Sequence, residues 1–270
     1  MGDFKGHKSN PFCSRNVLRK HPLVWFSFFL GGTMKKNLRK AFLYTILAFS
    51  LASSYAGDAA VFSDIGFSED GRTYIFGQYG KTDKKYEAWA EIYTVDVEKN
   101  TYVPGEVFRT KPSAATTKIS GKTAFEELSK KTLWKRRPYK CTPCKPQNLL
   151  YVRETESKKS TDEIVFKDFE GSNETKEIFY CLRLVPTYHG SGPDIESQFY
   201  ILLEKKDSNG NILLSRKLGT PDLRRKGISS YRIDRIFTDK SGKSFVIIIE
   251  KTQLDETGTS IRYMVETVRF

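Results

Sequence analysis

The segment Cys141-Thr-Pro-Cys144 places two thiols three residues apart, a spacing found in redox centres, in metal sites and in local disulfides. A thioredoxin-like redox centre needs this motif to follow a strand and open a helix. Here the motif follows a predicted helix and continues into Lys145-Pro146, which is the wrong context for that chemistry. The choice between a metal site and a disulfide then depends on the compartment in which the chain works.

A zinc site at this motif would need two further ligands, and after residue 56 the chain offers only Cys181 and His189. His189 lies in the loop His189-Gly-Ser-Gly-Pro-Asp194, and no Gly-x-Ser-x-Gly turn accompanies it to supply a nucleophile. Two enzymatic roles stay open as alternatives to a binding role. One is a hydrolase with His189 as base, and the other is a thiol redox enzyme that uses Cys141 and Cys144. We assign no catalytic residue, metal or cofactor.

A basic stretch surrounds the cysteine motif, because no acidic residue occurs between Lys130 and Lys145. Aromatic rings interleaved with cations suit an anionic polymer or a protein partner. The simpler alternative is a solvated helix face. The residues that we assign to a partner-binding surface are Lys130, Lys131, Trp134, Lys135, Arg136, Arg137, Tyr139 and Lys140.

The first 56 residues differ from the rest of the chain. A basic segment begins at Met34, an apolar run of 11 residues extends from Ala41 to Leu51, and small residues precede a cleavage position after Ala56. This is the pattern of a secretory signal peptide, Met34–Ala56, and its apolar run is too short for a permanent membrane span. Because a signal peptide acts from the N-terminus, we interpret residues 1–33 as a leader that precedes the true translation start.

Export changes how the charge and the cysteines are interpreted. Residues 1–56 hold 9 of the 45 basic and 1 of the 32 acidic residues, so the net charge falls from +13 to +5. A nucleic-acid partner is therefore not expected, and the predicted location is periplasmic or secreted. Oxidising conditions favour a structural disulfide, and we expect Cys181 to pair with Cys141 or Cys144.

Residues 57–270 read as one exported domain rich in β-structure. Asp70-Gly71 between β-branched and aromatic runs predicts a hairpin. From Trp89 to Val97, alternate residues form two faces of a strand. Thr123-x-x-Glu126 predicts a helical insertion of about 123–137. Later strands are expected at 149–152, 163–169, 177–185, 198–203 and 212–216. The expected fold class is all-β, mainly antiparallel, with one helical insertion.

The two ends of this domain repeat one pattern. The residues from Ile65 to Ile75 match those from Ile236 to Val246 without a gap, and Glu91-Ile-Tyr-Thr-Val95 echoes a later segment around Tyr263. A strand–turn–strand–loop–strand unit at both ends favours a propeller-like or closed sheet or sandwich in which the ends meet. Two unrelated hairpins in one antiparallel sheet are the alternative.

Gly66-Phe-Ser-Glu-Asp-Gly-Arg72, Ala90-Glu-Ile-Tyr-Thr-Val-Asp-Val97 and Tyr231-Arg-Ile-Asp-Arg235 resemble a bacterial family of predicted secreted proteins, domain of unknown function 2259. The resemblance covers most of residues 57–270 and is weak over 111–200. The family has no established activity, so the resemblance implies no catalytic residues. The first two segments are also similar to blades of TolB-type periplasmic propellers, which implies a scaffold and no particular activity.

The sequence therefore predicts an exported, non-catalytic β domain that binds an envelope protein or an anionic polymer. It predicts no permanent membrane span after cleavage and no nucleic-acid partner.

Overall fold

The computed structural model describes residues 58–154, 163–255 and 258–270, which form three sheets and one α-helix. The central sheet has the strand order β1 (Asp58–Ala59), β14 (Gly258–Arg269), β13 (Ser244–Asp255), β12 (Ile228–Thr238) and β6 (Leu149–Val152). The helix-side sheet has the order β2 (Val61–Phe67), β3 (Thr73–Lys81), β4 (Ala88–Asp96) and β5 (Thr101–Arg109). The distal sheet has the order β10 (Ile212–Leu218), β9 (Glu196–Asp207), β8 (Ile178–His189) and β7 (Ile164–Lys167), and β11 (Arg225–Lys226) also pairs with β9.

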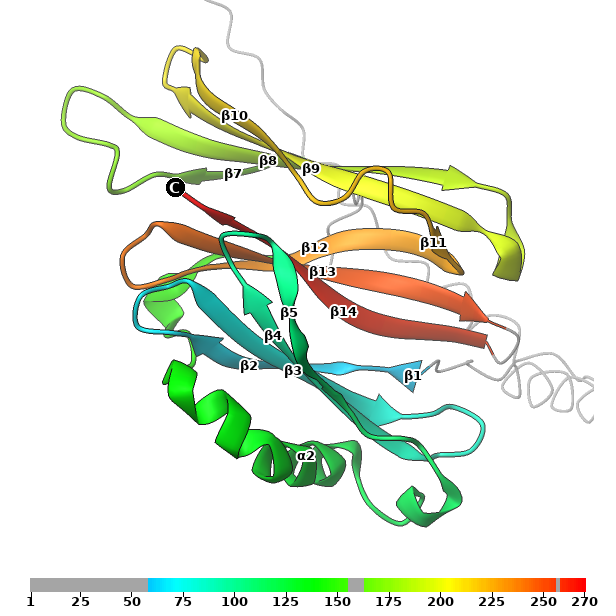
Figure 1. The fold of residues 1–270 in the computed structure, drawn as a ribbon. Helices are drawn as coiled ribbons and strands as arrows, with labels where there is room; N and C mark the ends of the chain where they lie inside the picture. The colour runs from blue at the N-terminus through cyan, green and yellow to red at the C-terminus, as the bar shows by residue number, and fades with distance from the viewer. Residues whose placement is uncertain (1–57, 155–162, 256–257) are drawn as a thin grey trace, which may run out of the picture. The chain divides into compact units, whose positions relative to one another are not determined.

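The three sheets and the helix α2 (Gly121–Arg136) stack in layers, with the central sheet between the other two (Figure 1). One core, which includes Leu182, Ile201 and Ile247, lies between the distal and central sheets. A second, which includes Phe76, lies between the central and helix-side sheets, and a third, which includes Ile92, lies between the helix-side sheet and α2. The all-β fold with one helix is confirmed. Its layers form a sandwich, and a propeller-like closure is not confirmed.

The central position of β13 explains its sequence. A strand with cores on both faces must be apolar at every position, not at alternate ones. The run from Phe245 to Ile249 is apolar throughout and at most 3% exposed. Phe245, Ile247 and Ile249 pack toward the distal sheet, whereas Val246 and Ile248 pack toward the helix-side sheet. In the helix-side sheet, Tyr93 and Val95 of β4 pack toward the central sheet and Ala90 and Ile92 pack toward α2, which agrees with the two faces that the sequence predicted.

The two hairpins that repeat in sequence share one turn structure. Between β2 and β3, the Ser68 hydroxyl accepts a hydrogen bond of 2.9 Å from the Thr73 amide. Between β12 and β13, the Asp239 carboxylate accepts one of 2.9 Å from the Ser244 amide. In both turns the glycine three residues after the capping residue has a φ of 67°. The predicted hairpin repeat is therefore present in the fold.

The repeat does not extend in register to the third strand. Tyr93 of β4 faces Phe76, whereas Tyr263 of β14 faces Glu250, three residues beyond the counterpart of Phe76. The β13–β14 hairpin is longer than the β3–β4 pair, and this length shifts the register. The two units also lie in different sheets, so they are stacked and do not belong to one antiparallel sheet.

Helix α2 begins earlier than the sequence predicted. Ser120 is its N-cap and accepts a hydrogen bond from the Thr123 amide, so the predicted capping box at Thr123 is wrong. Gly121 lies against Gly80 of β3, where a Cβ would be 2.7 Å from the Gly80 carbonyl oxygen. This close contact fixes the helix on the sheet. Single 3-10 turns occur at η2 (Ala114–Thr116), η3 (Arg137–Tyr139), η4 (Pro146–Asn148) and η5 (Gly192–Asp194).

The two ends of the described chain meet in the central sheet, where β1 pairs in parallel with β14. The Ala60 amide continues this contact by donating a hydrogen bond of 3.0 Å to the Ile261 carbonyl. The predicted leader (1–33) and signal peptide (34–56) lie outside the described residues. Within residues 58–154, 163–255 and 258–270, no helix has the length and apolar character that crossing a bilayer requires.

Candidate functional site

The cysteine motif forms a loop that is held tightly against β2. The Thr142 amide donates a hydrogen bond of 3.0 Å to the Phe67 carbonyl, which makes an isolated antiparallel bridge. Gly66, with a φ of 111°, allows this approach, because a Cβ there would lie 1.7 Å from the Thr142 carbonyl oxygen. The loop is therefore built into the fold by a glycine that is distant in sequence.

Asp64 of β2 fixes the far side of this loop. Its carboxylate accepts hydrogen bonds from the Tyr74 hydroxyl (2.8 Å) and from the Cys144 amide (2.6 Å). Asp64 therefore joins β2 to β3 and to the cysteine loop. Asp234 lies within β12 and forms ion pairs with Arg153 and Arg235. Asp70 and Asp96, in contrast, cap turns.

The environment of the two thiols opposes redox catalysis. Cys141 packs against the core next to α2, and Cys144 packs against the core next to the central sheet. Burial raises the pKa of the Cys141 thiol to about 12. Burial, followed by the nearby Asp64 carboxylate, also raises the pKa of the Cys144 thiol. A reactive cysteine needs a lowered pKa, so these thiols have the properties of structural residues.

The structure does not bring Cys181 or His189 to the cysteine motif. Both lie on β8, and the central sheet lies between β8 and the loop. Cys181 stands between the core residues Tyr180 and Leu182 and therefore lies on the opposite face of the strand. The three cysteines that the structure describes are free, so the pairing of Cys181 expected from the sequence is not formed. Among the residues that the structure describes, no three metal-ligating side chains converge, which leaves the zinc alternative without an assembled site.

The position of Cys181 predicts the outcome of a disulfide map. We expect Cys181 to remain a free thiol in protein isolated without reductant, because it lies on a different sheet from the other cysteines. Alkylation of the denatured protein followed by mass spectrometry should label Cys181 fully. The reduced protein is the control in which every cysteine is labelled. A peptide that links Cys181 to Cys141 or Cys144 would contradict the fold.

His189 is exposed at the end of β8, and its imidazole makes no hydrogen bond or ion pair with the described part of the chain. A catalytic base needs a group that orients its ring, as in the hydrolase triads. Across the ladder His189 faces Glu196, whose carboxylate forms an ion pair with Arg224.

Five of the eight predicted partner-binding residues are exposed on the outer side of α2 and at the turn η3 that follows it. Trp134 is 72% exposed and the adjacent Leu133 is 53% exposed, which is unusual for apolar side chains of this size. Four cations on the same segment are also exposed, and we call this set of six residues the α2 outer surface. Its members are Lys130, Lys131, Leu133, Trp134, Arg137 and Lys140.

Three residues assigned to this surface have other roles. Arg136 is buried, and its guanidinium donates hydrogen bonds to the Thr132 hydroxyl and to the Ser129 carbonyl and hydroxyl. Tyr139 donates a hydrogen bond of 2.9 Å to Glu106 of β5. Lys135 is half-buried and donates to the Gly105 carbonyl. The contacts of Tyr139 and Lys135 join the end of α2 to β5, whereas those of Arg136 stay within α2.

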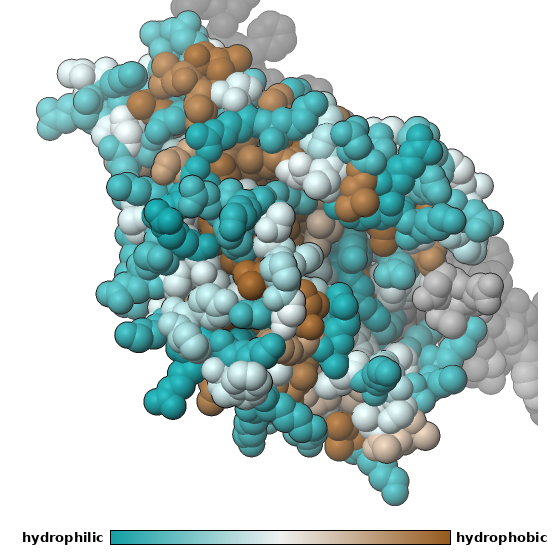
Figure 2. Space-filling model, in the orientation of Figure 1, coloured by the Kyte–Doolittle hydropathy of each residue, from teal (hydrophilic) through white to brown (hydrophobic). Residues whose placement is uncertain are grey.

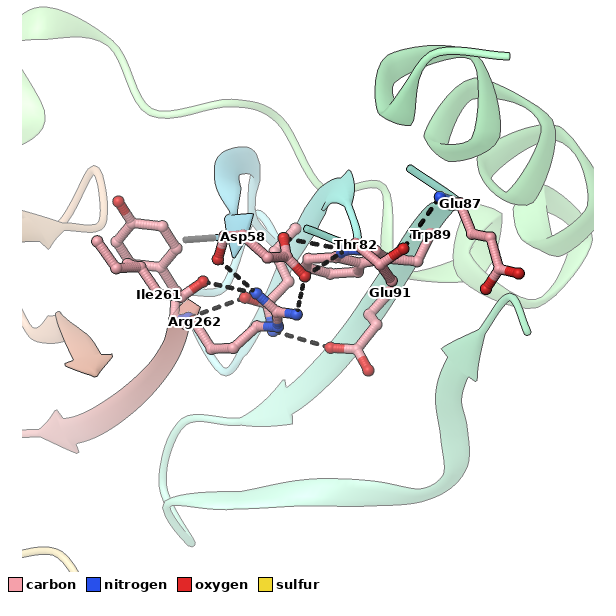
Figure 3. A network of polar contacts seen from close by, with 9 residues as sticks. Asp58, Thr82, Glu87, Trp89, Glu91, Ile261 and Arg262 are labelled. Atoms are coloured by element: carbon pink, nitrogen blue, oxygen red, sulfur yellow. Dashed lines mark hydrogen bonds and ion pairs between the residues drawn. The ribbon is translucent and has the colours of Figure 1, made fainter. Parts of the chain in front are cut away.

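A polar cluster at the start of the domain has no counterpart in the sequence analysis (Figure 3). Arg262 of β14 forms an ion pair with Asp58 of β1, and its guanidinium lies 4.1 Å from the centre of the Trp89 ring. The Trp89 indole N–H donates to the same carboxylate at 3.2 Å. Arg262 also donates to the Asp58 and Ile261 carbonyls. Asp58 and Arg262 are 204 residues apart, so no local pattern could reveal the pair.

A second group of polar contacts adjoins this cluster on the helix-side sheet. Glu91 accepts hydrogen bonds from Gln78 at 2.9 Å, from the Tyr93 hydroxyl and from Arg109 at 3.0 Å. Gln78 in turn accepts from the Tyr263 amide at 2.8 Å and so connects β3 to β14. Burial, together with the Glu91 carboxylate, raises the pKa of Tyr93 to about 12. These groups are satisfied and join the two sheets.

The comparisons with known proteins agree with this domain. A family described as Predicted secreted protein (DUF2259) matches residues 75–269, which extend from β3 into the last residues of β14 and include α2, the cysteine motif and Arg262. Searches of the curated proteins and of the solved structures return no match. The family match spans well over half of the chain, and the chain therefore belongs to the DUF2259 family of predicted secreted proteins.

Proposed function

We propose that this protein is an exported, non-catalytic domain that binds the negatively charged lipid surface of the cell envelope through the α2 outer surface. The observation that carries the proposal is Trp134, which is 72% exposed among cations. A tryptophan with an adjacent leucine and flanking lysines is the composition of interfacial membrane-binding segments. The pair Leu133 and Trp134 would enter the headgroup region, and the cations would contact lipid phosphates.

Export of the domain is supported by the family, whose description is that of a secreted protein. The signal peptide Met34–Ala56 would direct the chain to the periplasm or the exterior, and cleavage after Ala56 would begin the mature protein just before β1. A peripheral contact then suits a domain whose described residues contain no membrane-spanning helix.

The exposed groups are sufficient for reversible binding. Burial of Leu133 and Trp134 contributes roughly 2–4 kcal/mol. Each of the four exposed cations adds about 1 kcal/mol near an anionic surface. The total corresponds to an apparent dissociation constant between about 1 and 100 μM of accessible lipid. Neither contribution is large enough alone, so binding should require both the anionic lipid and the tryptophan.

A lipid surface suits this site better than a protein partner. Stable protein interfaces bury about 800 Å² on each side and have several apolar anchors near their centre. The α2 outer surface has two adjacent apolar side chains, and cations surround them on the same segment. This arrangement provides little apolar area for a protein but matches a flat anionic surface that accepts one aromatic anchor.

Vesicle binding tests the proposal. We expect the purified protein to sediment with phosphatidylglycerol-containing vesicles, to release them as salt rises, and to ignore neutral phosphatidylcholine vesicles. Trp134→Ala should weaken binding about tenfold, since it removes most of the apolar contribution. The matched control is Phe169→Ala, which removes an aromatic side chain that is 79% exposed between β7 and β8.

The charge contribution has its own control. Lys130→Glu with Lys131→Glu should abolish binding, whereas Lys176→Glu with Lys240→Glu makes the same charge change at exposed positions outside α2 and should have little effect. Equal losses in the two double variants would show that net charge alone drives binding and would contradict a defined surface. Equal binding to neutral vesicles would contradict the proposal as well.

A further inference from the structure

Lys251 is a half-buried cation. Its ammonium group makes no hydrogen bond or ion pair within residues 58–154, 163–255 and 258–270. It follows Ile247 and Ile249 on the face of β13 that packs toward the distal sheet. In register it faces Tyr231 of β12 on one side and Arg262 of β14 on the other. Like charges directly opposite each other across two strands are destabilising. A side chain of this kind needs a counter-charge that the described residues do not supply.

Arg225 of β11 is a second cation that forms no ion pair with these residues, although it lies near enough to the buried Glu266 carboxyl to oppose the rise of its pKa that burial causes. Its guanidinium lies 5.0 Å from the centre of the Phe199 ring and donates hydrogen bonds to the Thr220 hydroxyl and the Leu223 carbonyl. In register Arg225 faces Ser197, whose hydroxyl is 2.8 Å from the hydroxyl of Tyr231. This series of contacts places Arg225 at the same end of the core as Lys251, on the opposite sheet.

The cations around Lys251 outnumber the acids. Arg225, Arg262 and Arg109 all lie close enough to lower the pKa of Lys251, after burial as the largest cause, and Glu91 opposes them. Arg262 is neutralised by Asp58, and Arg109 by Glu91. Two positive charges, those of Lys251 and Arg225, remain uncompensated by any ion pair among the described residues.

We propose that Arg225 and Lys251 form a binding site for a phosphate group. The two cations come from β11 and β13, and the hydrophilic part of the surface in Figure 2 is continuous over much of this face of the domain. A phosphate monoester has a charge near −2 at neutral pH, which matches the two uncompensated cations. Arginine and lysine together suit its oxygens, because the guanidinium binds two of them and the ammonium acts as a point charge. This site lies on different elements from the α2 outer surface and is independent of the proposed function.

Thermal unfolding with added inorganic phosphate tests the site. At constant ionic strength, set with sodium chloride, we expect phosphate to raise Tm saturably, by roughly 5 °C at a hundredfold excess over Kd. Acetate, with one negative charge, should bind at least tenfold more weakly. A rise of the same size with acetate, or with chloride alone, would overturn the assignment to phosphate.

Substitutions locate the site. Lys251→Met should remove the phosphate response, and in phosphate-free buffer it should raise Tm by a few degrees, because it removes an unpaired, half-buried cation. Arg225→Met should weaken phosphate binding at least tenfold. The matched control is Lys226→Met, which makes the same charge change at the next, exposed residue of β11. A phosphate response that survives in Lys251→Met, or that Lys226→Met removes equally, would overturn the proposal.

Discussion

Replacing Gly66 by alanine is expected to destabilise the protein by more than about 4 kcal/mol, a loss that mutations reach only through severe steric or burial effects. A Cβ at this position would lie 1.7 Å from the Thr142 carbonyl oxygen and 2.6 Å from the Pro143 nitrogen. Both are backbone atoms, so no side-chain rotation can relieve the contact. The cysteine motif would have to leave β2, which breaks the bridge to Phe67 and the hydrogen bond from Cys144 to Asp64. Because folded domains are stable by only about 5–15 kcal/mol, little stability would remain.

Urea unfolding of the purified variant measures this loss, and a sharp fall in soluble yield is its first sign. The matched control is Gly105→Ala in β5, where φ is 74° and no atom lies within 4 Å of the added Cβ. That substitution pays the cost of the left-handed backbone without a clash, about 1 kcal/mol. Similar losses at the two glycines would mean that backbone conformation, and not the contact with the cysteine motif, makes Gly66 necessary.

The sequence predicts the elements of this fold well because each has a strong local pattern. The alternation from Trp89 to Val97 indicates the two faces of β4 without any tertiary information. The hairpin repeat was also readable, since Gly71 and Gly242 occupy equivalent turn positions. Which strands share a sheet could not be predicted in this way, because the number of layers depends on contacts between strands far apart in the chain.

The candidate sites show the same division. Trp134 and its neighbouring cations form a continuous segment, so their shared exposure could be predicted from composition. Arg136 belongs to the same segment but turns back to Ser129, which follows from helix geometry and the packing of α2. No pattern in the sequence singles out Lys251 and Arg225. Their lack of ion pairs depends on how β11 of the distal sheet and β13 of the central sheet are placed across the core.

Arg262→Ala is expected to cost about 3–5 kcal/mol, because it leaves the Asp58 carboxylate buried without its charge partner. The Asp58 side chain is 8% exposed, and after the substitution it would retain the hydrogen bond from the Trp89 indole. The variant also loses the cation–π contact with Trp89 and the hydrogen bonds that hold β1 to β14. Urea unfolding should show the loss, and Arg183→Ala, at an exposed position of β8, should change stability by less than about 0.5 kcal/mol.

Substitution of Asp58 distinguishes the effect of the unpaired carboxylate from the effect of the packing that Arg262→Ala removes. In the Arg262→Ala background, Asp58→Asn removes the uncompensated charge and should recover roughly 1–3 kcal/mol, whereas in the native background it should destabilise. Asp58→Asn is expected to have effects of opposite sign on stability in the two backgrounds when the two side chains form an ion pair that is buried in the native state. If Asp58→Asn destabilised both backgrounds equally, the two side chains would act independently. The attachment of β1 to β14 would then rest on backbone hydrogen bonds, such as that from Ala60 to Ile261, and not on the arginine.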